Sequence, residues 1–148
     1  MSGPIIKQSR IVSASPEAIF NVLADPALHA VIDGSGSVRG SRPSAPKRLA
    51  LGSRFGMDMR ISVPYRITNT VVEFDEPRRI AWRHFGGHIW RYELEATDGG
   101  TLVTETFDGT HGRSRLAYSA MGIAEKHPVA MARTLERLDR LVTTGSPD

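Results

Sequence analysis

Apolar and polar positions alternate through the middle of the chain. Over residues 55–63 every second side chain is apolar, as expected for a strand with one buried face. The residues expected on that face are Phe55, Met57, Met59, Ile61 and Val63. Further alternating or β-rich segments follow at 65–74, 79–84, 89–97 and 102–110. Gly86-Gly87 and Gly99-Gly100 separate the last three, and glycine pairs favour hairpins because glycine tolerates a positive φ. This pattern predicts an antiparallel meander.

The first third of the chain predicts a strand, two helices and a second strand. Residues 5–13 have the β-branched content of a strand. Ser15 is a suitable N-cap and Pro16 fits a first helical turn, so a helix is expected to begin there. Asp25-Pro26 ends that helix and starts a short one. The remaining predicted bounds are about 26–32 for this second helix, 36–42 for a strand and 43–53 for a loop.

A long helix is predicted at the C-terminal end. Leu135, Leu138, Leu141 and Val142 recur at helical spacing and mark its buried side. Pro128 is expected to kink or break it, giving a first part near 114–126 and a second near 128–143.

The order of elements is therefore one strand, two helices, six strands and one helix. We expect an α+β fold in a single domain spanning residues 1–148, with a curved antiparallel sheet of about seven strands around the C-terminal helix. A sheet with one apolar face must cover that face, and the long helix is the only element large enough. The space between sheet and helix is the candidate binding site.

Composition narrows the chemistry. The 148 residues include no cysteine, which excludes disulfides, thiolate metal sites and cysteine nucleophiles. The formal net charge is +3, but arginines and acids are interleaved, as in Arg91-Tyr92-Glu93, which is typical of solvated faces. We therefore expect no nucleic-acid partner. The densest basic stretch, 39–54, lies in a predicted loop, and a phosphate contact is its alternative interpretation.

Targeting signals are also missing from the printed sequence. No apolar run reaches the roughly 18 residues that a membrane span needs, and the first ten residues lack a signal-peptide core. We expect a cytoplasmic protein without a membrane span. The pattern leaves open whether the chain forms a homodimer.

The turns predict which side chains share the covered face of the sheet. Charged side chains of strands 79–84 and 89–97 should face water, so the residues between them face inward. We expect Trp82 opposite Trp90 and His84 opposite His88. A two-residue Gly99-Gly100 turn pairs Leu94 with Glu105, Tyr92 with Phe107 and His88 with His111, and the preceding connection pairs Val71 with Trp82 and Asn69 with His84.

Glu105 is the most informative of these inward positions. A carboxyl group on an apolar face must be paired, hydrogen-bonded or protonated, and burial would raise its pKa toward values that suit a general acid or base. The structural alternative is a glutamate satisfied by an arginine or by water, or turned outward by a bulge. Tyr92 has the same two interpretations, a core aromatic or a proton donor.

Polar residues are expected in one row near the end of the sheet where the long helix begins: Asn69, His84, His88 and His111. Three imidazoles can hold zinc, but no metal-binding spacing accompanies them, so a polar rim is the preferred interpretation. We expect no metal and no cofactor. The predicted ligand-binding residues are Met57, Met59, Asn69, Val71, Trp82, His88, Trp90, Leu94, Phe107 and Met121.

The chain resembles the START/SRPBCC superfamily, in its polyketide cyclase/dehydrase-like group. The resembling segments are 13–20 (SASPEAIF), 23–26 (LADP), 72–82 (VEFDEPRRIAW), 90–94 (WRYEL) and 103–108 (VTETFD). The resemblance implies a helix-grip fold with a hydrophobic cavity under the C-terminal helix. These motifs are structural and the family has no universal catalytic triad, so no catalytic residue is implied. Many relatives have a tryptophan in the second helix. In this chain the segment that begins at His29 takes its place, which makes His29 a further candidate for the polar rim.

Three functions follow. The first is binding of a small hydrophobic molecule, lipid-like or aromatic, in the predicted cavity. The second is a cofactor-free cyclase, dehydratase or hydrolase with Glu105 as acid or base, Tyr92 or His84 as its partner and Asn69 as a hydrogen-bond donor. The third is a protein-interaction or regulatory module without a small-molecule ligand, which would bind a partner protein or, as the alternative, nucleic acid through the basic segment 39–54.

Overall fold

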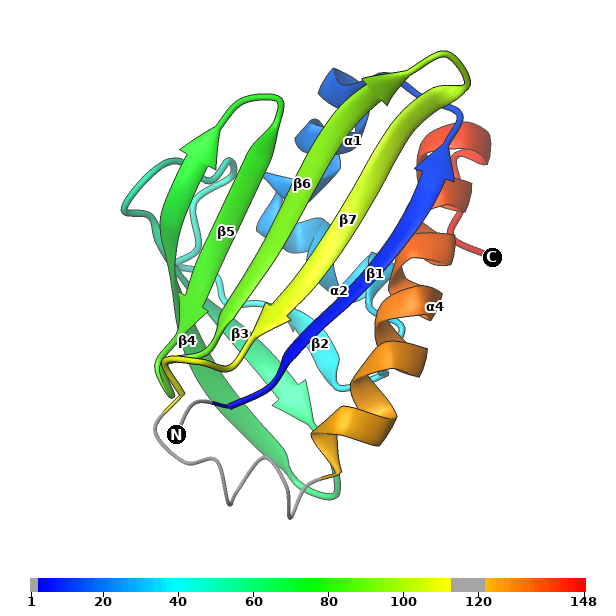
Figure 1. The fold of residues 1–148 in the computed structure, drawn as a ribbon. Helices are drawn as coiled ribbons and strands as arrows, with labels where there is room; N and C mark the ends of the chain where they lie inside the picture. Colours follow the sequence, from blue (N-terminus) through cyan, green and yellow to red (C-terminus); the bar gives the residue numbers. More distant parts are fainter. Residues whose placement is uncertain (1–2, 113–121) are drawn as a thin grey trace.

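A seven-stranded antiparallel sheet forms most of the fold. The computed structural model describes residues 3–112 and 122–148. The strands follow the order β1-β7-β6-β5-β4-β3-β2 across the sheet (Figure 1). Their bounds are β1 Ile5–Val12, β2 Val38–Ser41, β3 Arg54–Arg60, β4 Pro64–Asp75, β5 Arg79–His84, β6 Ile89–Thr97 and β7 Gly100–Asp108. The predicted meander, the two outer strands and the loop over 43–53 are confirmed.

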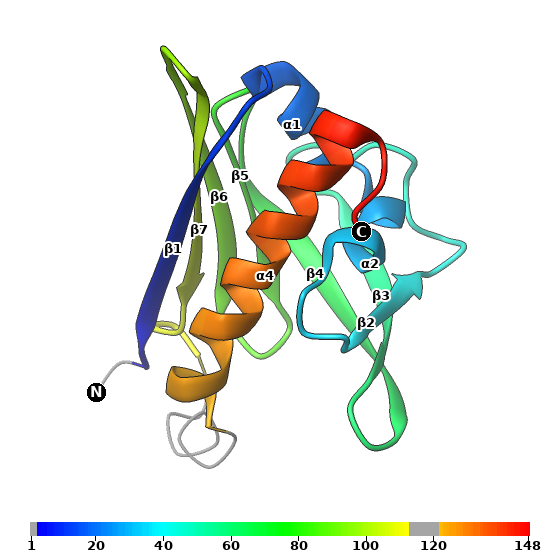
Figure 2. The ribbon, with the colours of Figure 1, turned by 90° about the vertical axis from the view of Figure 1, so that its right-hand side faces the viewer.

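Helices cover the concave face of this sheet, as Figure 2 shows. Helix α1 (Pro16–Leu23) begins at Ser15, whose hydroxyl accepts a hydrogen bond of 3.2 Å from the backbone N–H of Ala18. A short 3₁₀ helix (Pro26–Leu28) and helix α2 (His29–Ile32) follow. The long helix α4 (Ile123–Thr144) packs along β1 and against α1 and α2. The predicted order of elements and the α+β architecture are confirmed.

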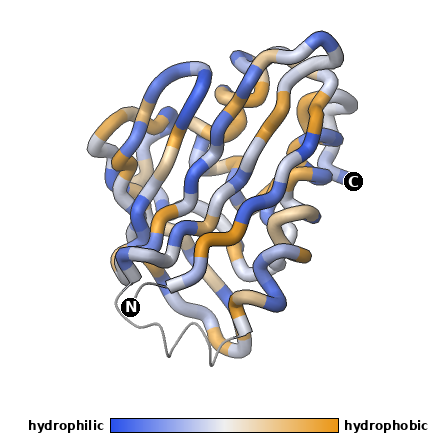
Figure 3. Tube along the Cα trace, in the orientation of Figure 1, coloured by the Kyte–Doolittle hydropathy of each residue, from blue (hydrophilic) through white to orange (hydrophobic). Residues whose placement is uncertain are grey.

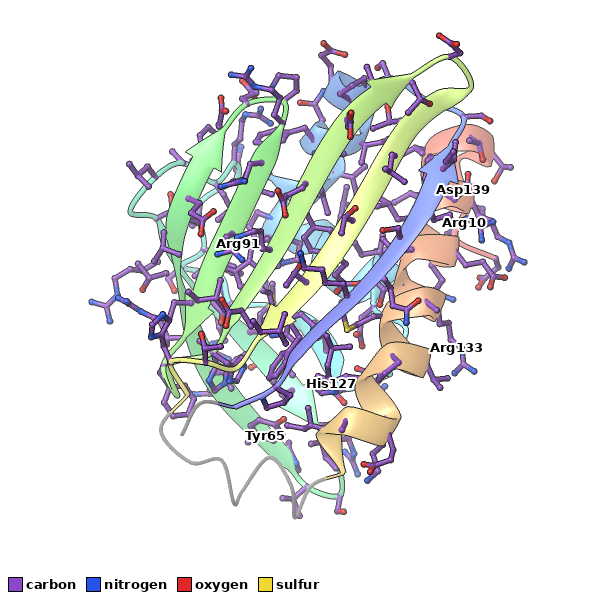
Figure 4. The ribbon with its side chains drawn as sticks, viewed as in Figure 1. Arg10, Tyr65, Arg91, His127, Arg133 and Asp139 are labelled. Carbon is purple, nitrogen blue, oxygen red and sulfur yellow. The ribbon has the colours of Figure 1, made fainter. Side chains whose placement is uncertain are left out.

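The core lies between the concave face and the helices. Hydrophobic and hydrophilic positions alternate along the strands (Figure 3), and the apolar set turns inward. Helix α1 adds Ile19, Phe20 and Leu23, and α4 adds Leu135 and Leu138. At the open edge of β1, Arg10 forms a 2.7 Å ion pair with Asp139 of α4 (Figure 4). The sheet and the helix are thus joined by apolar packing and by an ion pair at its edge.

The predicted break at Pro128 is wrong. A single helix runs from Ile123 to Thr144 with Pro128 inside it. Pro128 stands only six residues into the helix, so its ring removes one hydrogen bond, to the carbonyl of Ala124, near an end where bonds are few. Packing of the later turns holds the helix, since Met131 and Leu135 are buried. Most of the predicted first part, 114–126, lies outside the described residues.

The predicted register between β6 and β7 is wrong by two residues. Leu94 pairs with Val103, Tyr92 with Glu105 and Trp90 with Phe107. The turn residues are Asp98 and Gly99, while Gly100 pairs with Thr97. Gly100 has a φ of +135°, and a Cβ there would lie 2.1 Å from the carbonyl oxygen of Val12, so this glycine is required where β1 passes.

A shift of two keeps every side chain on its predicted face but changes its neighbours. His88 is therefore not opposite His111, which lies beyond β7 and is exposed. The buried face of β3 is also shorter than predicted, because the strand ends at Arg60 and Ile61 and Val63 are exposed.

Candidate ligand-binding site on the concave face

Two neighbouring rows of paired side chains define the candidate site. One row contains Ile80, Tyr92 and Glu105, on β5, β6 and β7. The next row, toward the start of α4, contains Val71, Trp82, Trp90 and Phe107, on β4 to β7. The pairs Trp82–Trp90 and Val71–Trp82 are those predicted from the turns.

Glu105 and Tyr92 form a buried hydrogen-bonded pair. The tyrosine hydroxyl donates to Oε2 of Glu105 over 2.9 Å, and each residue is only 4% exposed. Within the described residues, Oε1 of Glu105 has no hydrogen-bond partner. A buried polar atom of this kind calls for a partner such as a ligand or an ordered water.

Burial sets the protonation state of this pair. It raises the pKa of Glu105 to about 8, against the lowering by the Tyr92 hydrogen bond, and the charge of Asp33 raises it further. Burial, and then Glu105, raise the pKa of Tyr92 well above its ordinary range. At neutral pH the Glu105 carboxyl is therefore mostly protonated. Since Oε2 accepts from Tyr92, a proton on Oε1 makes that atom a hydrogen-bond donor.

An aromatic stack adjoins this pair. Trp82 stacks on His29 with ring centroids 4.7 Å apart, and its centroid lies 5.7 Å from that of Tyr92. The Nε2 atom of His29 lies 2.9 Å from the carbonyl oxygen of Leu23; because a carbonyl only accepts, Nε2 donates. Burial lowers the pKa of His29, so the ring is neutral. His29 was expected at the rim but is buried, because α2 lays it flat on Trp82.

A second cluster lies at the end of the sheet where α4 begins. It consists of His84, His88, Trp90, Phe107 and His127. The imidazoles of His84 and His88 stack 4.3 Å apart, and His127 lies 5.2 Å from Trp90 and 4.8 Å from Phe107 between ring centroids. Figure 4 shows His127 on α4 at this end of the sheet. We call these five residues the histidine–tryptophan cluster.

The histidines of this cluster are held neutral. Burial lowers the pKa of His84 and of His127. Burial and then the charges of His84 and His127 lower the pKa of His88 to about 3. The Nδ1 atom of His84 also accepts a hydrogen bond from the backbone N–H of Gly86. Neutral imidazoles make this end of the concave face weakly polar and aromatic.

His127 was missed by the sequence analysis. It stands four residues before Met131 and eight before Leu135, on the buried side of α4. The assumed break at Pro128 separated it from that stripe. Helical spacing continued through the proline would have placed it on the sheet.

Most of the predicted lining is packed. Met57, Val71, Trp82, Leu94 and Phe107 are buried in the apolar core. Trp90, His84, His88 and His127 are only partly buried, so these four members of the histidine–tryptophan cluster, unlike Phe107, remain partly accessible to solvent. Met121 lies outside the described residues.

Two hollows are described elsewhere on the molecule. One of about 650 Å³ lies beside β2, β3 and β4 and is bordered by Met59 and several arginines. The other, of about 830 Å³, lies on the convex face over charged residues such as Glu73 and Arg91. Met59 therefore borders a basic hollow and also packs against the apolar core beneath the concave face.

Asn69 and His84 lie at a different position along the strands from the Glu105–Tyr92 pair. Asn69 is buried opposite His84, and within the described residues its Oδ1 atom has no hydrogen-bond partner. His84 lies four residues along β5 from Ile80, the residue paired with Tyr92, a separation of roughly 13 Å at strand spacing. The structure thus brings Tyr92, but not His84, to Glu105.

Neither a metal centre nor a membrane-spanning helix is found in the described part of the chain. Among residues 3–112 and 122–148, no three histidine, aspartate or glutamate side chains are arranged to hold a metal ion. None of the helices in those ranges has the length and apolar content that crossing a bilayer requires.

A curled seven-stranded antiparallel sheet gripping a long C-terminal helix defines a helix-grip protein of the START/SRPBCC type. Residues 4–143 match the model of the family described as polyketide cyclase / dehydrase and lipid transport, and the chain belongs to that family. It is 35% identical over 146 residues to the uncharacterised protein Rv0088 of Mycobacterium tuberculosis, covering 95% of this chain and 65% of that protein. The chain thus spans just under two thirds of that relative.

Solved structures share the fold at low sequence identity. The AHSA1-like protein of Aeromonas hydrophila superimposes with a TM-score of 0.67 at 22% identity, over 98% of this chain and 96% of that one. The di-domain ARO/CYC StfQ of the steffimycin biosynthetic pathway superimposes with a TM-score of 0.72 at 12% identity, over 95% of this chain and 50% of StfQ. These likenesses support the fold alone.

Proposed function

We propose that this chain binds a small hydrophobic molecule, aromatic or lipid-like and carrying a carbonyl group, on the concave face between the sheet and α4. The observation that carries the proposal is the unpartnered Oε1 of Glu105, buried on an otherwise apolar and aromatic face. Membership of a family described by cyclase, dehydrase and lipid-transport activities supports it.

The ligand's chemistry follows from its surroundings. A protonated Oε1 donates a hydrogen bond, so the group opposite it should be an acceptor such as a carbonyl oxygen. Trp90 and His127 form a partly buried aromatic contact, and an aromatic lining of this kind favours a flat or unsaturated ligand. The ligand would enter beside the histidine–tryptophan cluster and reach inward to Glu105.

A fluorescence titration tests this proposal. The variants Trp82→Phe and Trp90→Phe each leave one tryptophan, so the fluorescence of each can be followed alone. The probes are a pair of ring compounds that differ only in a carbonyl group, and a fatty acid. We expect saturable quenching by the carbonyl compound, with the larger signal from Trp90. No saturable change with any probe in the folded wild-type chain would overturn the proposal.

A matched pair of variants tests the role of Glu105. Glu105→Leu removes the hydrogen-bond donor and should weaken binding of the carbonyl compound about ten-fold, while the compound without a carbonyl should bind with unchanged affinity. Glu105→Gln keeps a donor and should restore most of the affinity. Equal weakening of both compounds by Glu105→Leu would show that the residue acts through packing alone.

The geometry also favours a second candidate, acid–base catalysis of cyclisation or dehydration. A carboxyl with a pKa near 8 beside a tyrosine can give and take a proton near neutral pH. If a substrate with several carbonyl groups loses water in the presence of the chain, measured by mass spectrometry, Glu105→Gln should slow that step about 10²–10⁴-fold while binding persists. Turnover within a few-fold of wild type in Glu105→Gln would exclude this assignment.

A further inference from the structure

The turn between β3 and β4 carries apolar side chains that the core does not use. Ile61 is 58% exposed and Val63 is 67% exposed, and Tyr65 at the start of β4 is also exposed. Figure 2 shows this hairpin projecting beyond the rest of the sheet. Apolar side chains gathered on a projecting turn mark an interaction surface rather than a folding requirement.

Arginines surround the base of this hairpin. Arg39, Arg42, Arg60 and Arg66 line the hollow of about 650 Å³, together with Met59, Pro64 and Tyr65. They come from β2, the loop after it, and both strands of the hairpin, so the fold gathers charges that are spread along the sequence.

A single carboxylate offsets these charges among the residues that line the hollow. Nη1 of Arg42 lies 3.1 Å from Oδ1 of Asp58, and Nε of Arg66 lies 3.6 Å from the same oxygen. Four guanidinium groups against one carboxylate leave an excess of three positive charges here. The hollow therefore favours an anionic partner.

Further exposed apolar residues lie at the same end of the molecule. Phe85 in the β5–β6 turn and Val129 near the start of α4 are each more than half exposed. Figures 1 and 2 show that the β5–β6 turn, the start of α4 and the β3–β4 hairpin lie at the same end of the molecule. At the opposite end Asp98 lies between β6 and β7, while Glu76, between β4 and β5, forms an ion pair with Arg48.

We propose that this end docks on an anionic lipid bilayer. Ile61 and Val63 enter the interfacial region while the arginines of the hollow contact lipid phosphates. A free phosphate or a nucleic acid would use the arginines but would leave the exposed isoleucine and valine in water. A second copy of the chain would bring one arginine cluster against another. The combination of apolar tip and basic base therefore favours a lipid surface.

Docking in this orientation would bring the histidine–tryptophan cluster toward the bilayer, since that cluster lies at the same end. The docking proposal extends the proposed function but does not depend on it. Vesicle binding is measured without any interior ligand, and the fluorescence titration is measured without vesicles, so each can fail alone.

Vesicle co-sedimentation tests the proposal. The chain is mixed with vesicles of phosphatidylcholine alone and of phosphatidylcholine with phosphatidylglycerol. We expect binding to the mixed vesicles, at least about ten-fold weaker binding to phosphatidylcholine, and weakening by salt. Val63→Asp and the double variant Arg60→Gln/Arg66→Gln should each reduce binding to the mixed vesicles about ten-fold.

A matched control separates position from hydrophobicity. Leu51 is also 67% exposed but lies in the loop before β3, away from the hairpin tip. Leu51→Asp should leave vesicle binding unchanged, and circular dichroism checks that each variant is folded. Equal effects of Leu51→Asp and Val63→Asp would overturn the proposal, as would no binding to mixed vesicles.

Two competitors test the alternative anions. Inorganic phosphate that displaces the chain from vesicles at equal ionic strength would overturn the proposal in favour of a soluble phosphate ligand. A single-stranded oligonucleotide that binds wild type and Val63→Asp equally, but not Arg60→Gln/Arg66→Gln, would overturn it in favour of nucleic acid. Failure of both competitors, with loss of vesicle binding in Val63→Asp, supports the lipid surface.

Discussion

The hydroxyl of Tyr92 donates a hydrogen bond to Oε2 of Glu105 across the β6–β7 pair, deep on the concave face. This contact joins an acidic group to a neutral donor where few charges are present. It satisfies one carboxyl oxygen and leaves the other to face whatever occupies the site. The pair therefore links the stability of the fold to the chemistry that the site can perform.

Replacing Glu105 by glutamine should alter how stability depends on pH. The pKa of Glu105 is about 8 in the folded chain, above its ordinary value of 4.5. Its contribution is full below pH 4.5 and is lost as pH rises toward 8, because the unfolded chain ionises first. The free energy of unfolding should fall by about 1.4 kcal/mol per pH unit from this group in that window. Glu105→Gln should remove this fall in urea titrations at several pH values.

Glu95→Gln is the control for that experiment. Glu95 lies on the same sheet but is exposed, and the substitution is chemically identical. We expect its pH profile to follow wild type. If Glu105→Gln also followed wild type between about pH 5 and pH 8, the carboxyl would not be buried in the way described.

Removing only the hydroxyl of Tyr92 should destabilise the chain. Tyr92→Phe keeps the ring contact with Trp82 but leaves Oε2 of Glu105 without its donor. An unsatisfied buried polar group costs roughly 1–3 kcal/mol. In the wild-type chain the hydrogen bond from Tyr92 lowers the pKa of Glu105. Its loss should therefore raise that pKa further and extend the pH window of the stability change upward. Urea unfolding across pH measures both effects, and an unchanged profile would contradict the contact.

Acid should destabilise the chain through His88. Burial and the neighbouring charges of His84 and His127 lower its pKa to about 3. The contribution is therefore present above the ordinary value of 6.5 and is lost as pH falls toward 3, since the unfolded chain takes up the proton first. From this group the free energy of unfolding should fall by up to about 1.4 kcal/mol for each pH unit below 6.5, and His88→Gln should remove that fall.

The His88 measurement needs two comparisons. Glu105 acts in the opposite direction between pH 4.5 and 6.5, so His88→Gln is compared with wild type and, separately, within the Glu105→Gln background. His111→Gln is the control, because His111 is exposed. An acid profile identical in His88→Gln and His111→Gln would show that His88 is not held neutral by the fold.

The sequence was sufficient to predict the faces of the sheet, and it offered Tyr92 as one of two partners for Glu105, but it did not predict the strand register that pairs these two residues. Alternation puts Trp82, Trp90 and Glu105 on one side whichever glycine forms the turn. Choosing between Gly99-Gly100 and Asp98-Gly99 depends on Gly100 lying against Val12, a contact between distant parts of the chain. Turn rules carry no information on such a contact. The resulting error of two residues in the β6–β7 register put Leu94 opposite Glu105, where the structure has Tyr92.

The histidine–tryptophan cluster was only partly predictable for a related reason. His84 and His88 follow from one hairpin, whose geometry is local. His127 reaches them only because α4 continues through Pro128 and packs on the sheet. Local propensity argued against that continuity, and tertiary packing outweighed it.

A methyl group added at Gly34 should weaken the junction between the concave face and α4. The backbone N–H of Gly34 donates to Oγ1 of Thr134 over 2.8 Å. A Cβ at Gly34 would lie 2.5 Å from the carbonyl oxygen of Ala130 and 2.6 Å from the backbone nitrogen of Thr134, which cannot move unless α4 shifts. We expect Gly34→Ala to lower the free energy of unfolding, measured in urea, by roughly 1–3 kcal/mol or more, as for other overpacked sites.

Gly40→Ala is the control, since a Cβ there meets nothing within 4 Å. Thr134→Val removes the hydrogen bond without the clash and should cost less, whereas equal stability of Gly34→Ala and Gly40→Ala would show that the loop after α2 is not seated on α4.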